Sequence, residues 1–253
     1  MLSFRSMLIG SCLVAAVGIV APSVQADIIQ TFSVANANVG DGANLADATI
    51  AFDVSAAGNT VSVTITNESV MHAANELLRS VSFDVQTSGG PAPSSPDALA
   101  LADGKSVTVA SGGAATTTSL AGLAALGSNQ WTISSTSSLN NGGSGDASTF
   151  LLTSSGPKYL VIGPSSYVDA NASIAGNRAH SVFLGNSPTF TFHLANLAAA
   201  DSINNVVVGF GTGSDVVCAS MLSASSVPEA STLALLAVCS SLLLVSRRRA
   251  RPA

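Results

Sequence analysis

Apolar residues recur at every second position in much of this chain, and that period constrains the fold more than any other feature. Two runs, residues 50–54 and 61–65, show it best, with apolar side chains at Ile50, Phe52, Val54, Val61, Val63 and Ile65. A period of two places such side chains on one face of an extended strand. The intervening residues 55–59 end in Gly-Asn, which is typical of a hairpin connection. The pattern therefore predicts two antiparallel strands joined by a short turn.

Further segments resemble strands by the same criterion, namely residues 81–85, 105–110, 130–134, 158–162, 190–194, 205–210 and 216–220. In the best of these strands one face is apolar and the other carries Ser, Thr or Asp, which favours antiparallel sheets that are buried on one side. Two such sheets can bury their apolar faces against each other. We therefore expect an all-β fold, an antiparallel β-sandwich of the jelly-roll or immunoglobulin-like kind.

Segments of low complexity separate the predicted strands. Three of them are expected to be long loops, at residues 86–96, 111–119 and 134–149. Short helical segments are expected where Ala and Leu cluster, at residues 73–79, 120–126 and 194–201. The predicted body spans residues 27–222 as one domain. The proline-bearing segment 86–96 leaves open a division into a small N-terminal sheet and a larger remainder.

The first 26 residues have the pattern of a secretory signal peptide. Arg5 precedes an apolar stretch at residues 7–21, and small residues stand at Val24 and Ala26, just before Asp27. Such a segment is removed after export, so residues 1–26 are set apart from the fold. A first transmembrane helix is the alternative, but Pro22 interrupts the apolar run. Lipidation at Cys12 is disfavoured because the apolar core continues beyond it.

Charge and cysteine content exclude further classes. Residues 27–228 contain 13 acidic and four basic residues, a formal net charge of −9. So few cations cannot neutralise a phosphate backbone, and nucleic acid is therefore excluded as a partner. Cys218 is the one cysteine of this body, which leaves no internal disulfide, so the fold must be held by packing. We expect Cys218 to be a small buried apolar side chain.

The C-terminal tail predicts a single membrane-spanning helix. Residues 230–245 carry no charge and lie between Glu229 and a cluster of arginines. As a helix this segment would reach about 24 Å, somewhat less than the hydrocarbon core of about 30 Å. It spans marginally, and the arginines fix their end in the cytoplasm.

The same tail resembles a known bacterial sorting signal. Val227, Pro228 and Glu229, the short apolar helix and the residues Arg247, Arg248 and Arg249 together resemble the PEP-CTERM sorting domain over residues 226–249. The resemblance implies recognition and removal of the helix by an exosortase-type membrane protease, with delivery to the cell surface or extracellular matrix and association with exopolysaccharide. Ala230 departs from the family pattern, in which a second proline is usual. A plain tail anchor is the alternative.

Such tails also carry the label of a C-terminal domain of ice-binding proteins. That activity needs a flat, repeated array of threonines on one strand face. Thr64 and Thr66 form one such pair and Thr189 and Thr191 another, but no repeat period connects them. The activity therefore does not follow from the label.

Catalytic motifs are weak throughout the body. The glycines at residues 209–213 follow a strand, but the next residues continue as strand, whereas a phosphate cradle needs a helix there. His72, His180 and His193 have no neighbouring ligand at zinc spacing. His193 is expected to face solvent. No pair of carboxylates stands out, so we predict a protein that is not an enzyme.

One cluster of oxygen donors leaves a calcium site open. It consists of Asn36, Asn38, Asp41, Asn44 and Asp47, which surround two glycines. Calcium takes six to eight oxygen ligands on flexible loops, and extracellular modules bind it weakly. The spacing matches no EF-hand, and the same residues are common in an ordinary surface loop. No other cofactor is expected.

Sugar binding has only indirect support. It needs an exposed aromatic ring, and the Trp and Tyr residues are Trp131, Tyr159 and Tyr167. Trp131 lies within a predicted strand, where core packing is favoured over a sugar platform. No ligand-binding residue is assigned. The sequence thus favours a structural or adhesive surface protein, with a calcium-dependent carbohydrate-binding module or a secreted polysaccharide hydrolase as alternatives.

Overall fold

The structure is a computed structural model. It describes residues 27–39, 44–88, 93, 95–136, 147–164, 167–176, 181–198, 200–211 and 215–227. The predicted signal peptide, the predicted membrane helix at 230–245 and the arginine cluster lie outside these residues. Within the described ranges, no helix is long and apolar enough to cross a membrane.

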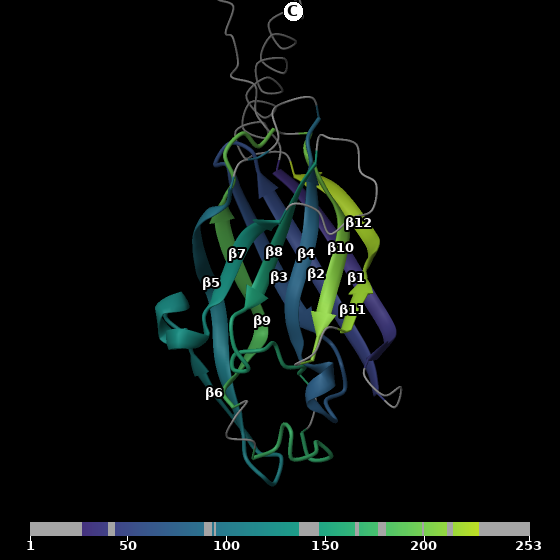
Figure 1. Ribbon diagram of the computed structural model, residues 1–253, viewed down its shortest axis with the longest axis vertical. Coiled ribbons are helices and arrows are strands. Elements are labelled where there is room, and N and C mark those ends of the chain that lie inside the picture. The colour runs from purple at the N-terminus through teal and green to yellow at the C-terminus, as the bar shows by residue number, and fades with distance from the viewer. Residues whose placement is uncertain are drawn as a thin grey trace, which may run out of the picture.

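The chain forms an all-β fold that contains a large antiparallel sheet (Figure 1). Its seven strands follow the order β12-β1-β2-β3-β9-β5-β6. In chain order they are β1 (Asp27–Val39), β2 (Asn44–Ser55), β3 (Thr60–Asn67), β5 (Asp97–Val109), β6 (Ala115–Ser119), β9 (Phe183–His193) and β12 (Ser220–Val227). Strands from before and after residues 86–96 therefore share this sheet.

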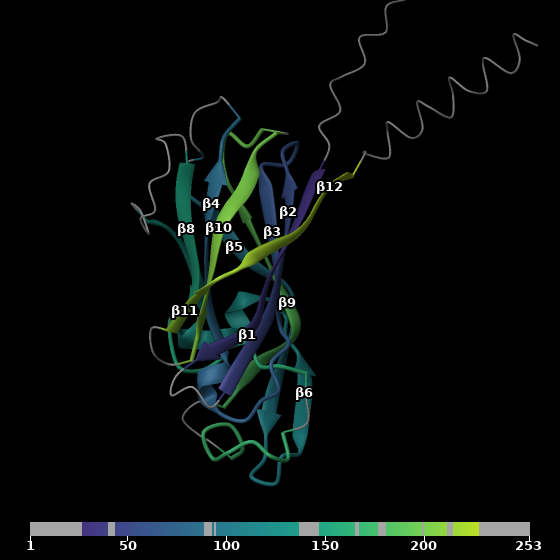
Figure 2. The same cartoon turned by 90° about the vertical axis from the view of Figure 1, so that its right-hand side faces the viewer.

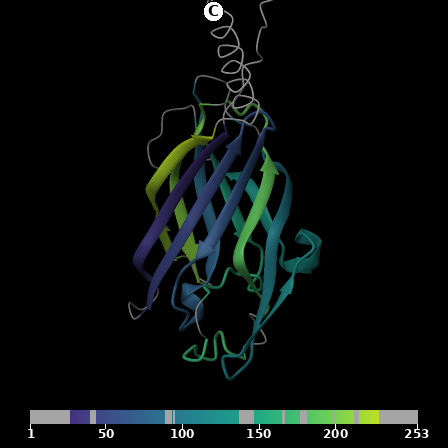
Figure 3. The same cartoon turned by 180° about the vertical axis from the view of Figure 1, so that it is seen from behind.

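A second antiparallel sheet lies against the first (Figure 3). Its five strands follow the order β11-β10-β4-β8-β7. In chain order they are β4 (Leu78–Gln86), β7 (Trp131–Thr136), β8 (Ala147–Ser154), β10 (Ser202–Phe210) and β11 (Asp215–Cys218). Two short 3-10 helices, η1 (Ala74–Glu76) and η2 (Leu123–Asn129), lie in the connections. Together the two sheets form the layers of a sandwich.

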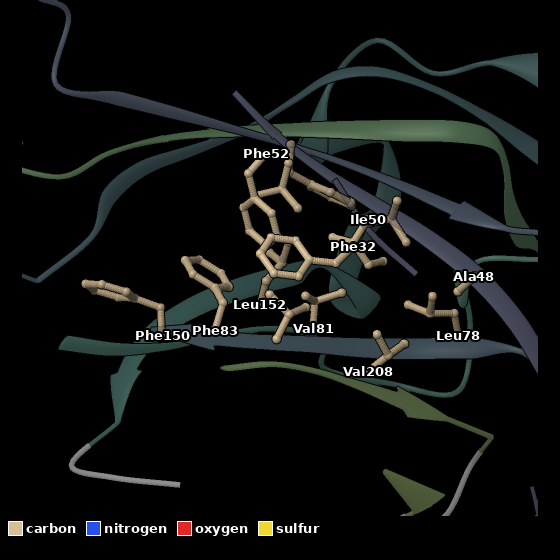
Figure 4. Close-up of a cluster of buried hydrophobic side chains, with 14 of the residues drawn as sticks. Phe32, Ala48, Ile50, Phe52, Leu78, Val81, Phe83, Phe150, Leu152 and Val208 are labelled. Atoms are coloured by element: carbon tan, nitrogen blue, oxygen red, sulfur yellow. The ribbon is translucent and has the colours of Figure 1, made fainter. Parts of the chain in front are cut away.

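Phenylalanine rings join the two sheets at the centre of the core (Figure 4). Phe52 from the larger sheet lies edge-on to Phe83 from the smaller one, with ring centroids 4.9 Å apart. Phe32 continues the cluster on one side of Phe52, at 5.7 Å, and Phe150 and Phe192 lie 5.8 Å and 6.1 Å from Phe83. Edge-on aromatic pairs add stabilisation to the large apolar area that each ring buries.

One side of the sandwich is closed by a strand that passes from sheet to sheet. β11 pairs with β10 in the smaller sheet, and after Ala219 the chain continues as β12, which pairs with β1 in the larger one (Figure 2). Gln30 reinforces this side. Its buried side chain donates to the carbonyl of Ile203 at 3.2 Å and accepts from the amide of Ile203 at 2.7 Å. A buried amide with both functions satisfied fixes β1 against β10.

A second link between the sheets is the segment predicted as a strand at residues 158–162. It is not a regular strand, because only Val161 makes β-bridges, with Leu78 of β4 and Leu184 of β9. The segment therefore links an interior strand of each sheet. Beside it lies a second, smaller core, whose buried members are Met71, Leu77, Val107, Val109, Leu160, Ile162, Tyr167, Ile174, Ala175 and Phe183.

The period-two prediction is confirmed for most strands. Six of the predicted runs correspond to β2, β3, β4, β5, β7 and β9, and β2 and β3 are joined at residues 55–60 as expected. Residues 205–210 lie in β10, and residues 216–220 are divided between β11 and β12.

Other expectations were wrong. The predicted loop 111–119 ends in β6, and the predicted loop 134–149 begins in β7 and ends in β8, with residues 137–146 outside the described ranges. Of the predicted helical segments, 73–79 contains only the short η1, and 120–126 overlaps the 3-10 helix η2. In the third, residues 194–198 and 200–201 form turns and irregular chain. Cys218 is exposed rather than buried, because β11 is an edge strand with little packed against it.

We predict that Phe83→Ala lowers the free energy of unfolding by about 3–5 kcal/mol, because it leaves a cavity where the two sheets meet. Urea denaturation of residues 27–227 measures this effect. Leu222→Ala is the control, since Leu222 is 63% exposed and its truncation should change stability by less than about 0.5 kcal/mol. Equal effects of the two substitutions would contradict the observed core.

Candidate functional site

The predicted calcium segment is mostly paired strand rather than loop. Asn36 and Asn38 lie near the end of β1, and Asp47 lies near the start of β2. The pairs Ala37 with Ala46, Asn38 with Leu45 and Val39 with Asn44 continue the ladder to the end of β1. Asp41 and the side chain of Asn44 are outside the described part of the chain.

Asp47 has a structural role in this hairpin. Its Oδ1 accepts a hydrogen bond from the backbone amide of Asn36 at 2.6 Å, where the register of β1 shifts and Asn36 has a φ of 51°. Its own amide donates to the hydroxyl of Ser69 at 3.0 Å. The carboxylate thus stabilises a bulge, because it satisfies an amide that the ladder leaves unpaired.

Among the described residues, no group of three or more His, Cys, Asp or Glu side chains is arranged to hold a metal ion. The calcium site stays a prediction. His72 and His193 are both exposed, the latter as predicted, and His180 is outside the described ranges. The glycine-rich segment at residues 209–213 is followed by strand β11, as expected; residues 212–214 lie outside the described ranges.

The sheet pairing gathers hydroxyl groups on the outer face of the larger sheet. Thr64 lies opposite Thr189 on the neighbouring strand, and their hydroxyls are hydrogen-bonded at 2.9 Å. Thr66 donates to Ser187, also at 2.9 Å. The two threonine pairs that share no repeat in sequence are therefore neighbours in space. The residues of this hydroxyl face are Thr31, Ser33, Thr49, Ser55, Thr60, Ser62, Thr64, Thr66, Thr189 and Thr191.

Two acidic residues lie at one end of the hydroxyl face. Partial burial and the nearby charge of Asp27 raise the pKa of Asp53 above its ordinary range. One carboxylate oxygen of Asp27 is buried and has no hydrogen-bond partner among the described residues. Asp27 itself is paired with Val227, the last residue of β12. Pro228, Glu229, Arg247, Arg248 and Arg249 of the predicted sorting signal lie outside the described residues.

Trp131 belongs to the core, as the sequence favoured. It is 1% exposed, and its ring centroid lies 4.9 Å from that of Phe190. Its indole Nε1 donates to the carbonyl of Tyr159 at 2.9 Å. An open depression of about 320 Å³ beside it is lined by residues that include Asp97 and Gln130, but the buried ring offers no platform for a sugar.

A second concavity, the hairpin crevice, lies between the β5–β6 hairpin and the loop that contains Tyr167. It has a volume of about 340 Å³ and is lined by Lys105, Val107, Ala115, Thr117, Gly163, Pro164, Tyr167 and Gly185. Tyr167 donates its hydroxyl to the carbonyl of Gly163 at 2.5 Å, and burial raises the pKa of this phenol. The part of this lining that the structure describes contains one basic residue, Lys105, and no acidic one.

Two glycines make the close packing around the hairpin crevice possible. A Cβ atom on Gly185 would lie 2.5 Å from Cγ2 of Val107, and one on Gly163 would lie 2.4 Å from the carbonyl oxygen of Ser69. Both distances are too short for a real side chain. The sequence alone gave no sign of this site, because Lys105 and Tyr167 are 62 positions apart and are brought together only by tertiary packing.

Comparisons with protein families, with curated proteins and with solved structures each found no match to this chain.

We predict that Trp131→Phe lowers the free energy of unfolding by about 1–3 kcal/mol, because the carbonyl of Tyr159 loses the donor of a partly buried hydrogen bond. Urea denaturation measures this loss. Tyr159→Phe is the matched control, since its hydroxyl makes only a long bond of 3.4 Å to Ala125. A fully stable Trp131→Phe variant would show that the indole is not a structural group.

Calcium is expected to leave the melting temperature of residues 27–227 unchanged, since the carboxylate of Asp47 is already engaged within the hairpin. Calorimetric melting with millimolar calcium and then with chelator tests this expectation. A higher melting temperature with calcium, lost in Asp47→Asn, would instead support the predicted site.

Proposed function

We propose that this protein is an exported, non-enzymatic component of the bacterial cell surface or extracellular matrix, with a structural or adhesive role. In this proposal a signal peptide directs export and the C-terminal helix holds the chain briefly in the membrane. An exosortase-type protease then recognises Val227, Pro228 and Glu229 together with the arginines and removes the helix. The basis for the proposed processing by an exosortase is the resemblance of the tail to sorting signals.

One structural observation supports the proposal most directly. Asp27, the residue after the predicted leader, is paired with Val227, the residue before the Pro-Glu pair. Both segments that the proposal assigns to export and sorting therefore join the body at the same end, while β6 lies toward the other end (Figure 2). A body joined to a membrane in this way can present its far end to the surroundings.

The hydroxyl face favours association with a hydrated polymer. Its Thr and Ser hydroxyls are half-buried and partly paired with one another, so the face is polar without a high charge. Such a surface can exchange hydrogen bonds with the hydroxyls of an exopolysaccharide. A jelly-roll or immunoglobulin-like relationship for the two-sheet body belongs to this proposal as well.

The alternatives from other classes have less support. A hydrolase on polysaccharide needs two carboxyl groups that flank the scissile bond. Of the described residues, none that lines the hairpin crevice is acidic, and Asp97 is the one acidic residue that lines the depression beside Trp131. A calcium-dependent sugar-binding module needs the predicted calcium site, for which the described residues offer no cluster.

Intact-mass analysis of the protein recovered from the native cell surface tests the proposed sorting. We expect a chain that begins at Asp27 and lacks the segment 230–245. Changing Pro228 and Glu229 to Ala should leave the tail attached and keep the protein in the membrane fraction. The control changes Ser223 and Ser225, which precede the sorting signal, to Ala and should be processed normally. A tail retained by both the native chain and the variants would reduce the signal to a plain anchor.

A further inference from the structure

We propose that the hairpin crevice binds a carboxylate-bearing sugar residue, with Lys105 as its charged contact. The inference rests on the proposed association with polysaccharide and specifies its chemistry, namely an acidic rather than a neutral glycan. Nothing in the sequence pattern assigned this site.

Strand pairing sets Lys105 into the crevice. On β5 it lies opposite Ser119 of β6 and opposite Gly185 of β9. It shares its face with Val107, two positions along, and Val107 is buried in the second core. Because Gly185 has no side chain, this residue leaves the space opposite Lys105 uncovered. The lysine therefore lines a floor of three strands, and the loop with Gly163, Pro164 and Tyr167 forms the wall.

Charge favours an anion at this position. Residues 27–228 have a net charge of −9, so a cation inside a concavity stands out against an acidic body. Among the described residues that line the crevice, Lys105 is the one that carries a charge. Within the described part of the chain its ammonium group has no ion pair or hydrogen bond, so its three donors are available to a ligand. A carboxylate is a natural partner because charge-assisted hydrogen bonds are stronger than neutral ones.

The rest of the lining suits a sugar better than a bare ion. Thr117 is exposed and lies opposite Val107, so its hydroxyl borders the crevice near Lys105. Pro164 and the ring of Tyr167, held by its bond to Gly163, supply apolar surface. Small-molecule sites combine apolar walls with a few polar groups and have volumes of about 300–1,000 Å³. The crevice, at about 340 Å³, accommodates a single sugar ring.

Titration calorimetry of the full chain in detergent tests this assignment. The probes are trigalacturonate, a neutral galactose trisaccharide, monomeric galacturonate and inorganic phosphate. We expect trigalacturonate to bind and the neutral trisaccharide to bind at least about tenfold more weakly. Lys105→Gln should weaken trigalacturonate binding by at least about tenfold, whereas Lys105→Arg, which keeps the charge, should retain it. Lys158→Gln is the matched control and should leave binding unchanged.

Three results would overturn the inference. These are equal binding of the neutral and acidic trisaccharides, unchanged affinity of Lys105→Gln, and displacement by phosphate at the same concentration as by galacturonate, which would indicate a general anion site. Tighter binding of the trisaccharide than of the monomer identifies a polymer as the source of the carboxylate. Surface delivery of Lys105→Gln should stay normal. Loss of glycan binding therefore tests the crevice, whereas loss of surface delivery tests the sorting proposal.

Discussion

The contact between Phe52 and Phe83 is the interaction on which the rest of the structure depends. Each sheet has one apolar face, and neither can be stable in water unless that face is covered. The body has a single cysteine, so no internal disulfide can join the two sheets. The phenylalanine cluster must therefore hold them face to face. Its position at the centre also decides which faces remain outside, including the hydroxyl face of the larger sheet.

Closure of the sandwich follows from this packing and positions everything of functional interest. On one side β11 and β12 pass from sheet to sheet, and Gln30 bonds β1 to β10. This arrangement joins Asp27 to Val227 at one end. Elsewhere Val161 connects β4 to β9, two interior strands, and the second core beside it includes Tyr167 of the loop that lines the crevice. The proposed attachment point lies at the end of the body where Asp27 meets Val227, and the β5–β6 hairpin, which lines the proposed binding crevice, lies toward the other end (Figure 2).

Period-two alternation made the central strands predictable, because the apolar residues at alternate positions, such as Ile50, Val63 and Val81, are the ones that the fold buries. β6 was not predicted because its five residues are all exposed; it is held to β5 by ladder hydrogen bonds and by the Ser106 hydroxyl, which donates to the carbonyl of Thr118. Residues 158–162 look like a strand, yet they bridge two sheets rather than join one. The crevice could not be predicted, since the neighbours of Lys105 depend on the register of β5 with β9, which tertiary packing sets.

A cross-strand disulfide tests most directly whether the two ends of the body meet. Ile29 lies opposite Ser225, and directly opposed residues in antiparallel strands have the Cα separation that a disulfide needs. In residues 27–227 with Cys218→Ser, the pair Ile29→Cys and Ser225→Cys should oxidise fully and raise the melting temperature. Ser33→Cys with Ser225→Cys, about 13 Å further along the strand, should remain reduced. A free thiol pair at 29 and 225, or equal oxidation of both pairs, would contradict the pairing of β1 with β12.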